Sequence, residues 1–440
     1  MEINFGTSVT NCSVIFDVNG NYGVQNNNML IHGNKWNGKI AFPNGITYSS
    51  IATSLIHNKP VQIPNSVTNM AFAFQSCYNF NQNIQIPNSV TSVSGIFQSC
   101  TNLNQNIQIP ANVTNIASAF QSCRNLNYNI QIPNKVTSVA YTFTSCTNLN
   151  QNIQIPANVT DMYSTFSGCQ NLNYNIQIPA NVRNMSETFA SCYNFNQNIQ
   201  IPNSVNNMKN AFASCYNLNQ NIQIPANVTN MYGTFQSCRN LNYNIQIPAN
   251  VTNMAFAFQS CYNFNQNIQI PNSVMSVSGI FTGCQNLNYN IQIPANVTQL
   301  YSTFKNCTNF NQNIQIPSNV TNMLEIFSGC TSLNQNIQIP NKVTSGASAF
   351  RNCNLMSDIT IANGIANNVF MGFISTFNEH ARNIWTDSTT AANLITTKII
   401  HPTNTNTKVA GQILPTWETI TNGYYNSYYN VYIYTNTVFS

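Results

Sequence analysis

Proline recurs every 23 residues over most of this 440-residue chain. Thirteen prolines keep the step from Pro64 to Pro340, and thirteen cysteines keep it from Cys77 to Cys353. A fixed period of about 20 to 29 residues, rich in aliphatic side chains, is typical of stacked coils that pack only against their neighbours. The chain is therefore predicted to fold mainly as a repeat solenoid, and not as two or three globular domains.

Each repeat contains an alternating triplet that is typical of a short strand with one buried face. In one repeat this triplet is Ile107-Gln108-Ile109, and Pro110 follows it. Proline lacks the amide hydrogen that the interior of a sheet requires, so it marks the end of the strand. Stacking of the repeats then predicts a parallel β-sheet of about 13 short strands.

The second half of each repeat carries apolar residues at spacings of three and four. Val113, Ile116 and Phe120, followed by Cys123, show the pattern. This spacing favours short helical or 3₁₀ turns on the back face of the solenoid. The same positions are predicted to form the core.

The chain divides into three predicted regions. Residues 61–355 hold the thirteen repeats, whereas residues 1–60 and 356–440 do not follow the period. Terminal coils would expose apolar side chains and strand edges unless other segments cover them. We therefore expect small, mainly β terminal regions: an N-terminal cap or attachment region, and a C-terminal cap, docking or oligomerisation region.

The charge of the chain argues against several partners. Charged residues make up 5% of the sequence, and the net charge of +5 is spread thinly, without a basic cluster. A nucleic acid partner is therefore not expected. Residues 1–20 do not resemble a secretion signal, and no segment approaches the roughly 18 apolar residues that span a membrane, so membrane insertion is not expected either.

A single cysteine in each repeat indicates one shared role. We expect a column of buried free thiols that act as small apolar side chains, and disulfides between adjacent coils are the alternative. Zinc binding is less favoured because all histidines lie outside the repeats. These histidines are His32, His57, His380 and His401. No cofactor is predicted.

Asparagines at positions such as 125, 127 and 129 recur in almost every repeat. Identical amides that stack one coil apart can form hydrogen-bonded ladders, although a polar ligand surface would explain the pattern too. Carboxylates in the repeats are limited to Asp161, Glu187 and Glu325. Because no paired acids and no catalytic motif emerge, the protein is predicted not to be an enzyme.

The string I-x-I-P-x-x-V-T, followed by F-x-x-C and N-(L/F), resembles the BspA-type leucine-rich repeat. Phe80-Asn81-Gln82-Asn83-Ile84 is also similar to a related surface-protein repeat. The resemblance covers residues 61–355 and implies a leucine-rich-repeat solenoid with an adhesive, non-enzymatic binding role. Met70 to Val90 reappears unchanged at Met254 to Val274. Recent duplication and the missing signal favour a phage virion appendage, such as a tail fibre, over a bacterial cell-surface adhesin.

Two positions vary between repeats while the core positions stay fixed. One follows the Leu/Phe-Asn pair, and the other follows the cysteine. Tyrosine offers a rigid contact face with a polar tip, which suits receptor binding to sugars or proteins, although packing over neighbouring coils is the alternative. The candidate ligand-binding residues are Tyr128, Tyr174, Tyr243, Tyr289, Tyr78, Arg124, Tyr193, Tyr216, Arg239 and Tyr262.

Six tyrosines crowd into eleven residues near the C-terminus and indicate an interface. They are Tyr424, Tyr425, Tyr428, Tyr429, Tyr432 and Tyr434. We expect a virion or extracellular surface location, a homo-oligomer, and two kinds of partner. These are a host-surface glycan or protein, and a protein that anchors the chain to a virion or a cell surface. A structural spacer or capsid decoration protein without a ligand is the alternative.

Overall fold

The computed structural model describes residues 67–356, Ile63, Asn65 and the strands of the terminal regions. The chain forms two compact units, Met1–Asn227 (unit 1) and Val228–Ser440 (unit 2). The strands are β1 (Cys12–Phe16), β2 (Tyr22–Asn26), β3 (Met29–Gly33), β4 (Ile337–Ile339), β5 (Asp358–Ile361), β6 (Arg382–Thr386), β7 (Glu418–Ile420), β8 (Gly423–Asn426) and β9 (Val431–Thr435).

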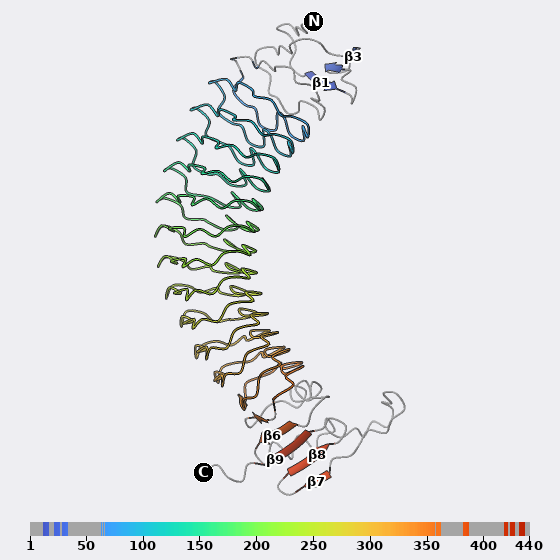
Figure 1. The fold of residues 1–440 in the computed structure, drawn as a ribbon, viewed down its shortest axis with the longest axis vertical. Coiled ribbons are helices and arrows are strands. Elements are labelled where there is room, and N and C mark those ends of the chain that lie inside the picture. Colours follow the sequence, from blue (N-terminus) through green and yellow to red (C-terminus); the bar gives the residue numbers. More distant parts are fainter. Residues whose placement is uncertain are drawn as a thin grey trace. The chain divides into compact units, whose positions relative to one another are not determined.

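Stacked 23-residue coils make up the repeats of each unit (Figure 1). Backbone hydrogen bonds join neighbouring coils through the segment that follows each proline. The amides of Phe72, Phe74 and Ser76 each donate to the carbonyl 22 residues later, over 2.7–2.8 Å. The amides between them, those of Ala73 and Gln75, donate to the carbonyl three residues earlier, over 3.1–3.2 Å. Alternate amides therefore bond between coils and within a coil.

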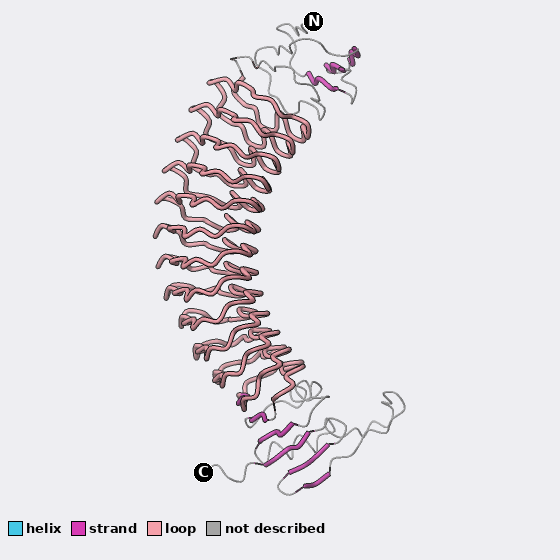
Figure 2. Tube along the Cα trace, in the orientation of Figure 1, coloured by secondary structure: helices cyan, strands magenta, loops and turns pink. Residues whose placement is uncertain are grey.

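This alternation takes the place of the predicted helical turns. Two positions in each coil have a positive φ, as at Phe72 (59°) and Ser76 (62°), which a continuous right-handed helix does not allow. The described residues contain no helix, and Figure 2 draws the coils as loops and turns. The prediction of helical or 3₁₀ turns on the back face is not confirmed, because the apolar spacing belongs to a run of hydrogen-bonded turns.

The strand predicted at each Ile-Gln-Ile triplet is present at β4, which pairs in parallel with β5. In the other described repeats the triplet lies outside the strands, and parallel contacts between coils are single bridges, such as Asn69 to Ser92. Polar groups near the triplet bond within the coil. Gln108 Nε2 donates to Asn106 Oδ1 over 3.1 Å. A sheet of about 13 strands is therefore not confirmed.

The core follows the predicted columns of apolar residues. Val, Phe, Cys and Ile at the fixed positions are buried in coil after coil. The phenylalanine rings stack along each unit: Phe166 lies 5.7 Å from Phe143 and 5.8 Å from Phe189 between ring centroids. Burial of a large apolar side chain contributes roughly 1.5–3 kcal/mol, so the repeated columns supply most of the stability of each unit.

The described segments of the terminal regions are strands. The strands β1, β2 and β3 form an antiparallel sheet. In unit 2 the sheet order is β4-β5-β6-β9-β8-β7. The first four of these strands are parallel and the last three antiparallel. The register aligns Ile337, Ile359, Ile384 and Ile433, so the isoleucine row of the last coil continues into the C-terminal sheet.

A glycine at one variable position allows the exposed aromatic ring of the preceding coil to lie against its backbone. Gly95 has a φ of +60°, and a Cβ there would clash with the ring of Phe72. We expect Gly95→Ala to lower the free energy of unfolding by about 1–3 kcal/mol, because the ring must move and a left-handed residue gains a side chain. Urea unfolding followed by circular dichroism measures this loss.

The ring clash and the backbone strain can be separated with a second variant. Ser118 occupies the same position one coil later with a φ of 56°, so a small side chain is tolerated there. Adding Phe72→Ser to Gly95→Ala should therefore restore most of the lost stability. Equal stability losses in the single and double variants would contradict the clash.

Candidate binding surface

The cysteine column lies in the core and has a structural role. All thirteen cysteines of the repeats are buried and free, which confirms the predicted column of thiols. Thiols along the column donate to a phenylalanine carbonyl in the preceding coil, as Cys169 Sγ does to Phe143 over 3.1 Å. Burial raises the pKa of the Cys169 thiol well above its ordinary value. The column therefore supplies packing, and its thiols stay protonated.

Asparagine ladders form one part of the outer surface. Asn102 Nδ2 donates to Asn79 Oδ1 over 3.2 Å, and Asn125 donates to Asn102 over 3.4 Å. A second column accepts from the backbone, since the amide of Asn104 donates to Asn81 Oδ1 over 2.9 Å. The predicted ladders are confirmed, and they hold the adjacent variable positions at a fixed spacing.

The position after each cysteine, here called the cysteine-flanking column, carries aromatic and cationic side chains. In unit 1 the rings of Tyr193 and Tyr216 stack at 4.6 Å with an interplanar angle of 4°. In unit 2 the Arg239 guanidinium lies 5.6 Å from the centre of the Tyr262 ring. Tyr78 is 53% exposed, and Arg124 is also exposed. The structure thus brings some members together as pairs between coils.

The position after the Leu/Phe-Asn pair, here called the Gln/Tyr column, holds either glutamine or tyrosine. Where the residue is glutamine, as at Gln105, its Nε2 donates to Asn81 Oδ1 of the preceding coil over 3.2 Å. The tyrosines are each 41–43% exposed. These tyrosines are Tyr128, Tyr174, Tyr243 and Tyr289. At these four positions, a solvent-exposed tyrosine ring takes the place of a glutamine whose amide bonds to the preceding coil.

A third variable column went unrecognised in the sequence. It consists of two adjacent positions, one and two residues after the buried Met/Val/Ile position, within the turns that join the coils. Here Tyr141 and Tyr163 meet edge to face at 4.9 Å, and Ser164 Oγ donates to Glu187 over 3.0 Å. Hydrogen bonding with Tyr141, then burial and Glu187, raises the pKa of Tyr163 to about 12. Variation between repeats was the signal that could have found these positions.

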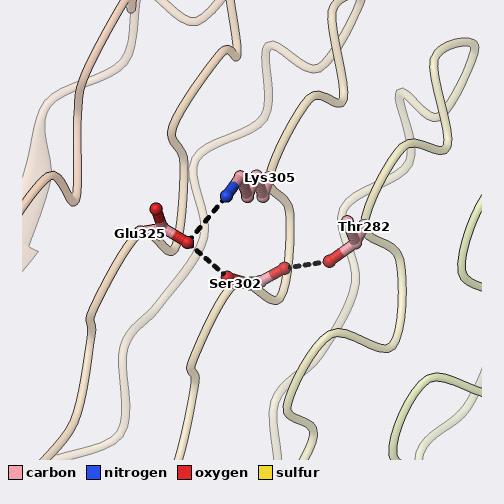
Figure 3. Close-up of polar contacts among 4 residues, drawn as sticks. All are labelled: Thr282, Ser302, Lys305 and Glu325. Atoms are coloured by element: carbon pink, nitrogen blue, oxygen red, sulfur yellow. Dashed lines mark hydrogen bonds and ion pairs between the residues drawn. The ribbon is translucent and has the colours of Figure 1, made fainter.

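Unit 2 holds a related arrangement, here called the Glu325 frame, formed by Thr282, Ser302 and Glu325 (Figure 3). Thr282 Oγ1 donates to the Ser302 carbonyl over 2.5 Å, and Ser302 Oγ donates to Glu325 over 3.1 Å. Lys305 Nζ lies 2.7 Å from the same carboxylate. The hydrogen bond from Lys305, more than any other contact, holds the pKa of Glu325 below its usual range.

The predicted C-terminal interface falls on strands and partly outside the described residues. Tyr424 and Tyr425 belong to β8, and Tyr432 and Tyr434 belong to β9. Tyr425 of β8 is aligned with Tyr432 of β9 in the antiparallel register. Tyr428 and Tyr429 lie outside the described residues.

Comparison with known families decides the classification of these coils. The BspA type leucine-rich repeat region (6 copies) matches residues 44–173 and 254–375, more than half of the chain. The chain belongs to the BspA-type leucine-rich repeat family. A second family, described as a Mycoplasma protein of unknown function, DUF285, matches residues 137–246 and 206–293. The resemblance inferred from the repeat motif is thereby confirmed.

A solved structure of a bacterial leucine-rich repeat protein shows the same fold. This BspA-type chain is similar to a leucine-rich repeat protein from Bacteroides ovatus, with 24% identity, a TM-score of 0.60, and coverage of 80% of this chain and 94% of the other. A leucine-rich repeat protein from Eubacterium ventriosum shares 20% identity over 76% and 92% of the two chains, with a TM-score of 0.48. No curated protein matches the chain. The BspA-type repeats therefore have a leucine-rich-repeat fold.

Two kinds of feature are missing from the described part of the chain. It contains no group of three or more His, Cys, Asp or Glu side chains placed to hold a metal ion. It also contains no helix of the length and hydropathy that crossing a membrane would require.

Proposed function

We propose that the protein is a non-enzymatic binding protein whose repeats recognise a glycan on another surface. The observation that carries this proposal is the stacked Tyr193–Tyr216 pair, held beside an asparagine ladder. Flat aromatic faces pack against the apolar faces of sugar rings, and amides exchange hydrogen bonds with their hydroxyls. The low charge of the chain suits such a neutral ligand.

A surface setting is part of this proposal. Members of the BspA-type family are generally surface proteins, and the second matched family is named for a Mycoplasma protein. These names favour a bacterial cell-surface adhesin, and the phage virion appendage stays a prediction. The C-terminal tyrosines of β8 and β9 are proposed to dock onto an anchoring protein or a second copy of the chain.

The Gln/Tyr column allows a test of glycan binding that should leave the fold intact. The change replaces all four tyrosines of this column by glutamine, the residue that other repeats already carry there. Each new amide can donate to the preceding asparagine, as Gln151 does to Asn127 over 3.2 Å. We expect glycan affinity to fall about ten-fold or more. A glycan array identifies an oligosaccharide that the wild-type protein binds, and titration with that oligosaccharide measures the affinity.

Thermal unfolding provides the control for this variant, because its midpoint should stay close to that of the wild-type protein. A matched second variant, Tyr193→Thr with Tyr216→Thr, uses the threonine found at this position in other repeats. Thr101 Oγ1 there donates to the Tyr78 carbonyl over 3.2 Å. Unchanged glycan binding in both variants would contradict the assignment of the site to these tyrosine columns, and no glycan binding by the wild-type protein would favour a structural spacer.

A further inference from the structure

The glutamines of the Gln/Tyr column share one kind of acceptor, an asparagine oxygen of the preceding coil. Gln105 donates to Asn81 Oδ1, and the later glutamines from Gln151 to Gln335 repeat this bond, over 3.0–3.2 Å. Each of these asparagine oxygens also accepts from a backbone amide, as Asn81 does from Asn104 over 2.9 Å. Two donors of the protein therefore bond to each oxygen.

A tyrosine in this column does not supply the second donor. Beside Tyr128, Asn104 Oδ1 accepts from the backbone amide one coil later over 3.0 Å. Beside Tyr174, Asn150 Oδ1 accepts in the same way over 3.0 Å. Within the described part of the chain, neither oxygen has another donor. Each of these tyrosines therefore combines an exposed ring with an asparagine oxygen that can accept from a ligand hydroxyl.

The residue after the cysteine changes together with the tyrosine. Where the Gln/Tyr column holds tyrosine, this residue is arginine or glutamine, and where the column holds glutamine, it is tyrosine or threonine. Arginine and glutamine are long side chains that donate through N–H groups. Each tyrosine of the column therefore has an N–H donor four residues earlier in the same loop. These donors are Arg124, Gln170, Arg239 and Gln285.

The tyrosines of the Gln/Tyr column lie two coils apart within each unit. Tyr128 and Tyr174 belong to unit 1, and Tyr243 and Tyr289 belong to unit 2. Between the first two, Gln151 is half-buried and bonded to the preceding coil, whereas the two rings are 41% and 43% exposed. Hydrogen-bonded coils about 4.8 Å apart place two such rings roughly 10 Å from each other. Each unit thus presents two exposed rings separated by a less exposed amide.

We propose that each unit carries one site for a neutral β-1,4-linked glycan of at least three sugars, here called the paired-tyrosine site. This assignment rests on the glycan binding proposed above. Alternate sugars of an extended β-1,4-linked chain present the same face, and each sugar advances the chain by about one coil spacing. Tyr128 and Tyr174 therefore match the first and third sugars of such a chain. The unit 2 site consists of Arg239, Tyr243, Gln285 and Tyr289.

The choice of a neutral glycan follows from the two donors of each site. Arg124 accompanies the first ring of unit 1, whereas Gln170 accompanies the second. Because an uncharged amide takes the same position as the guanidinium, the shared property is the N–H donor and not the charge. In unit 2 the charge of Arg239 already lies against the Tyr262 ring, at 5.6 Å from its centre. A donor, an acceptor and a ring face together suit sugar hydroxyls and the apolar face of a sugar ring.

Titration calorimetry of the full chain tests this assignment with β-1,4-linked oligomers of glucose and of N-acetylglucosamine. We expect two equal sites per chain, and an affinity that rises about ten-fold or more between two and three sugars, because the third sugar reaches the second ring. Either series supports the proposal, and their order identifies the sugar. Maltose oligomers, which are α-1,4-linked, should lack the rise. Tighter binding of β-1,4-linked glucuronic acid oligomers would overturn the choice of a neutral glycan.

Removal of one site gives the decisive comparison. Tyr128→Gln with Tyr174→Gln should reduce the number of sites from two to one and leave the affinity of the remaining site unchanged. The mirror variant, Tyr243→Gln with Tyr289→Gln, should give the same result. Each new glutamine can donate to an asparagine of the preceding coil, as Gln151 does, so the thermal midpoint should stay near that of the wild-type protein. Two sites in either variant would overturn the proposal.

Removal of the second ring from both sites tests whether the rings act in pairs. Tyr174→Gln with Tyr289→Gln should keep the binding of two sugars and abolish the gain from the third. A gain that survives in this variant would contradict the pairing. Failure of the assignment also differs from failure of glycan binding itself. A wild-type protein that binds other glycans on the array but no β-1,4-linked oligomer overturns the assignment alone, whereas one that binds no glycan overturns both.

Discussion

The repeats are expected to lose their stability steeply above pH 9, because folding buries a column of thiols. An ordinary cysteine has a pKa of 9.0, and burial is the main cause that raises the pKa of thiols such as Cys123, Cys146 and Cys169. Each thiol therefore ionises in the unfolded chain before it does so in the folded chain. The stabilising contribution is fully present below pH 9 and is lost as the pH rises towards the folded pKa.

The size of this effect follows from the number of thiols that unfold together. When the pH exceeds the pKa of the unfolded thiol, each thiol that stays protonated in the folded chain lowers the free energy of unfolding by about 1.4 kcal/mol per pH unit. Five thiols of unit 1 have a raised pKa: Cys100, Cys123, Cys146, Cys169 and Cys192. If all five thiols become exposed in one unfolding step, the free energy of unfolding falls by about 7 kcal/mol per pH unit, which is comparable to the whole stability of a typical domain.

Urea unfolding at pH 8, 9 and 10, followed by far-ultraviolet circular dichroism, measures this dependence. Iodoacetamide labelling supplies the control, since the buried thiols should react at pH 8 only after urea is added. Cys169→Ala removes one titrating group and should flatten the pH dependence by about 1.4 kcal/mol per pH unit. A free energy of unfolding that stays constant between pH 8 and pH 10 would refute the prediction.

Sequence reasoning identified the columns of the fold but not their local conformation. The 23-residue period located Val, Phe and Cys positions that the structure buries. The spacing of Val113, Ile116 and Phe120 suggested a helix, because apolar residues three and four apart lie on one side of a helix. Turns with left-handed residues produce a similar spacing of buried residues. Serine and asparagine often hold these left-handed positions, so glycine did not mark them.

The candidate surface was predicted in part. The cysteine-flanking and Gln/Tyr columns were found because they vary beside fixed neighbours, and their tyrosines are wholly or partly exposed. The pairing of Tyr193 with Tyr216 follows from the same register. The Glu325 frame was missed because its members come from three successive coils and none forms a sequence motif. Their convergence depends on hydrogen bonds between coils, which a single repeat does not reveal.

The phenylalanine column should show the largest loss of stability from a single substitution. Phe166 is buried, and its ring stacks between Phe143 and Phe189. Its amide also donates to the Thr188 carbonyl of the next coil over 2.9 Å, so the side chain packs beside the bonds that join the coils. We expect Phe166→Ala to lower the free energy of unfolding by about 3–5 kcal/mol, measured by urea denaturation.

A matched substitution at another buried phenylalanine separates this column from general sensitivity of the core. Phe195 is also fully buried, but most repeats carry leucine at its position, as at Leu172 and Leu218. Phe195→Leu should therefore cost less than about 1.5 kcal/mol, because the surrounding coil already accommodates leucine elsewhere. Similar losses for Phe166→Ala and Phe195→Leu would contradict the prediction that the fixed phenylalanine position is the more sensitive of the two. Phe195 also stacks on Phe189, at 4.9 Å between ring centroids, so a loss confined to Phe166→Ala would mean that an apolar side chain filling the fixed position between coils matters more than an aromatic ring at position 195.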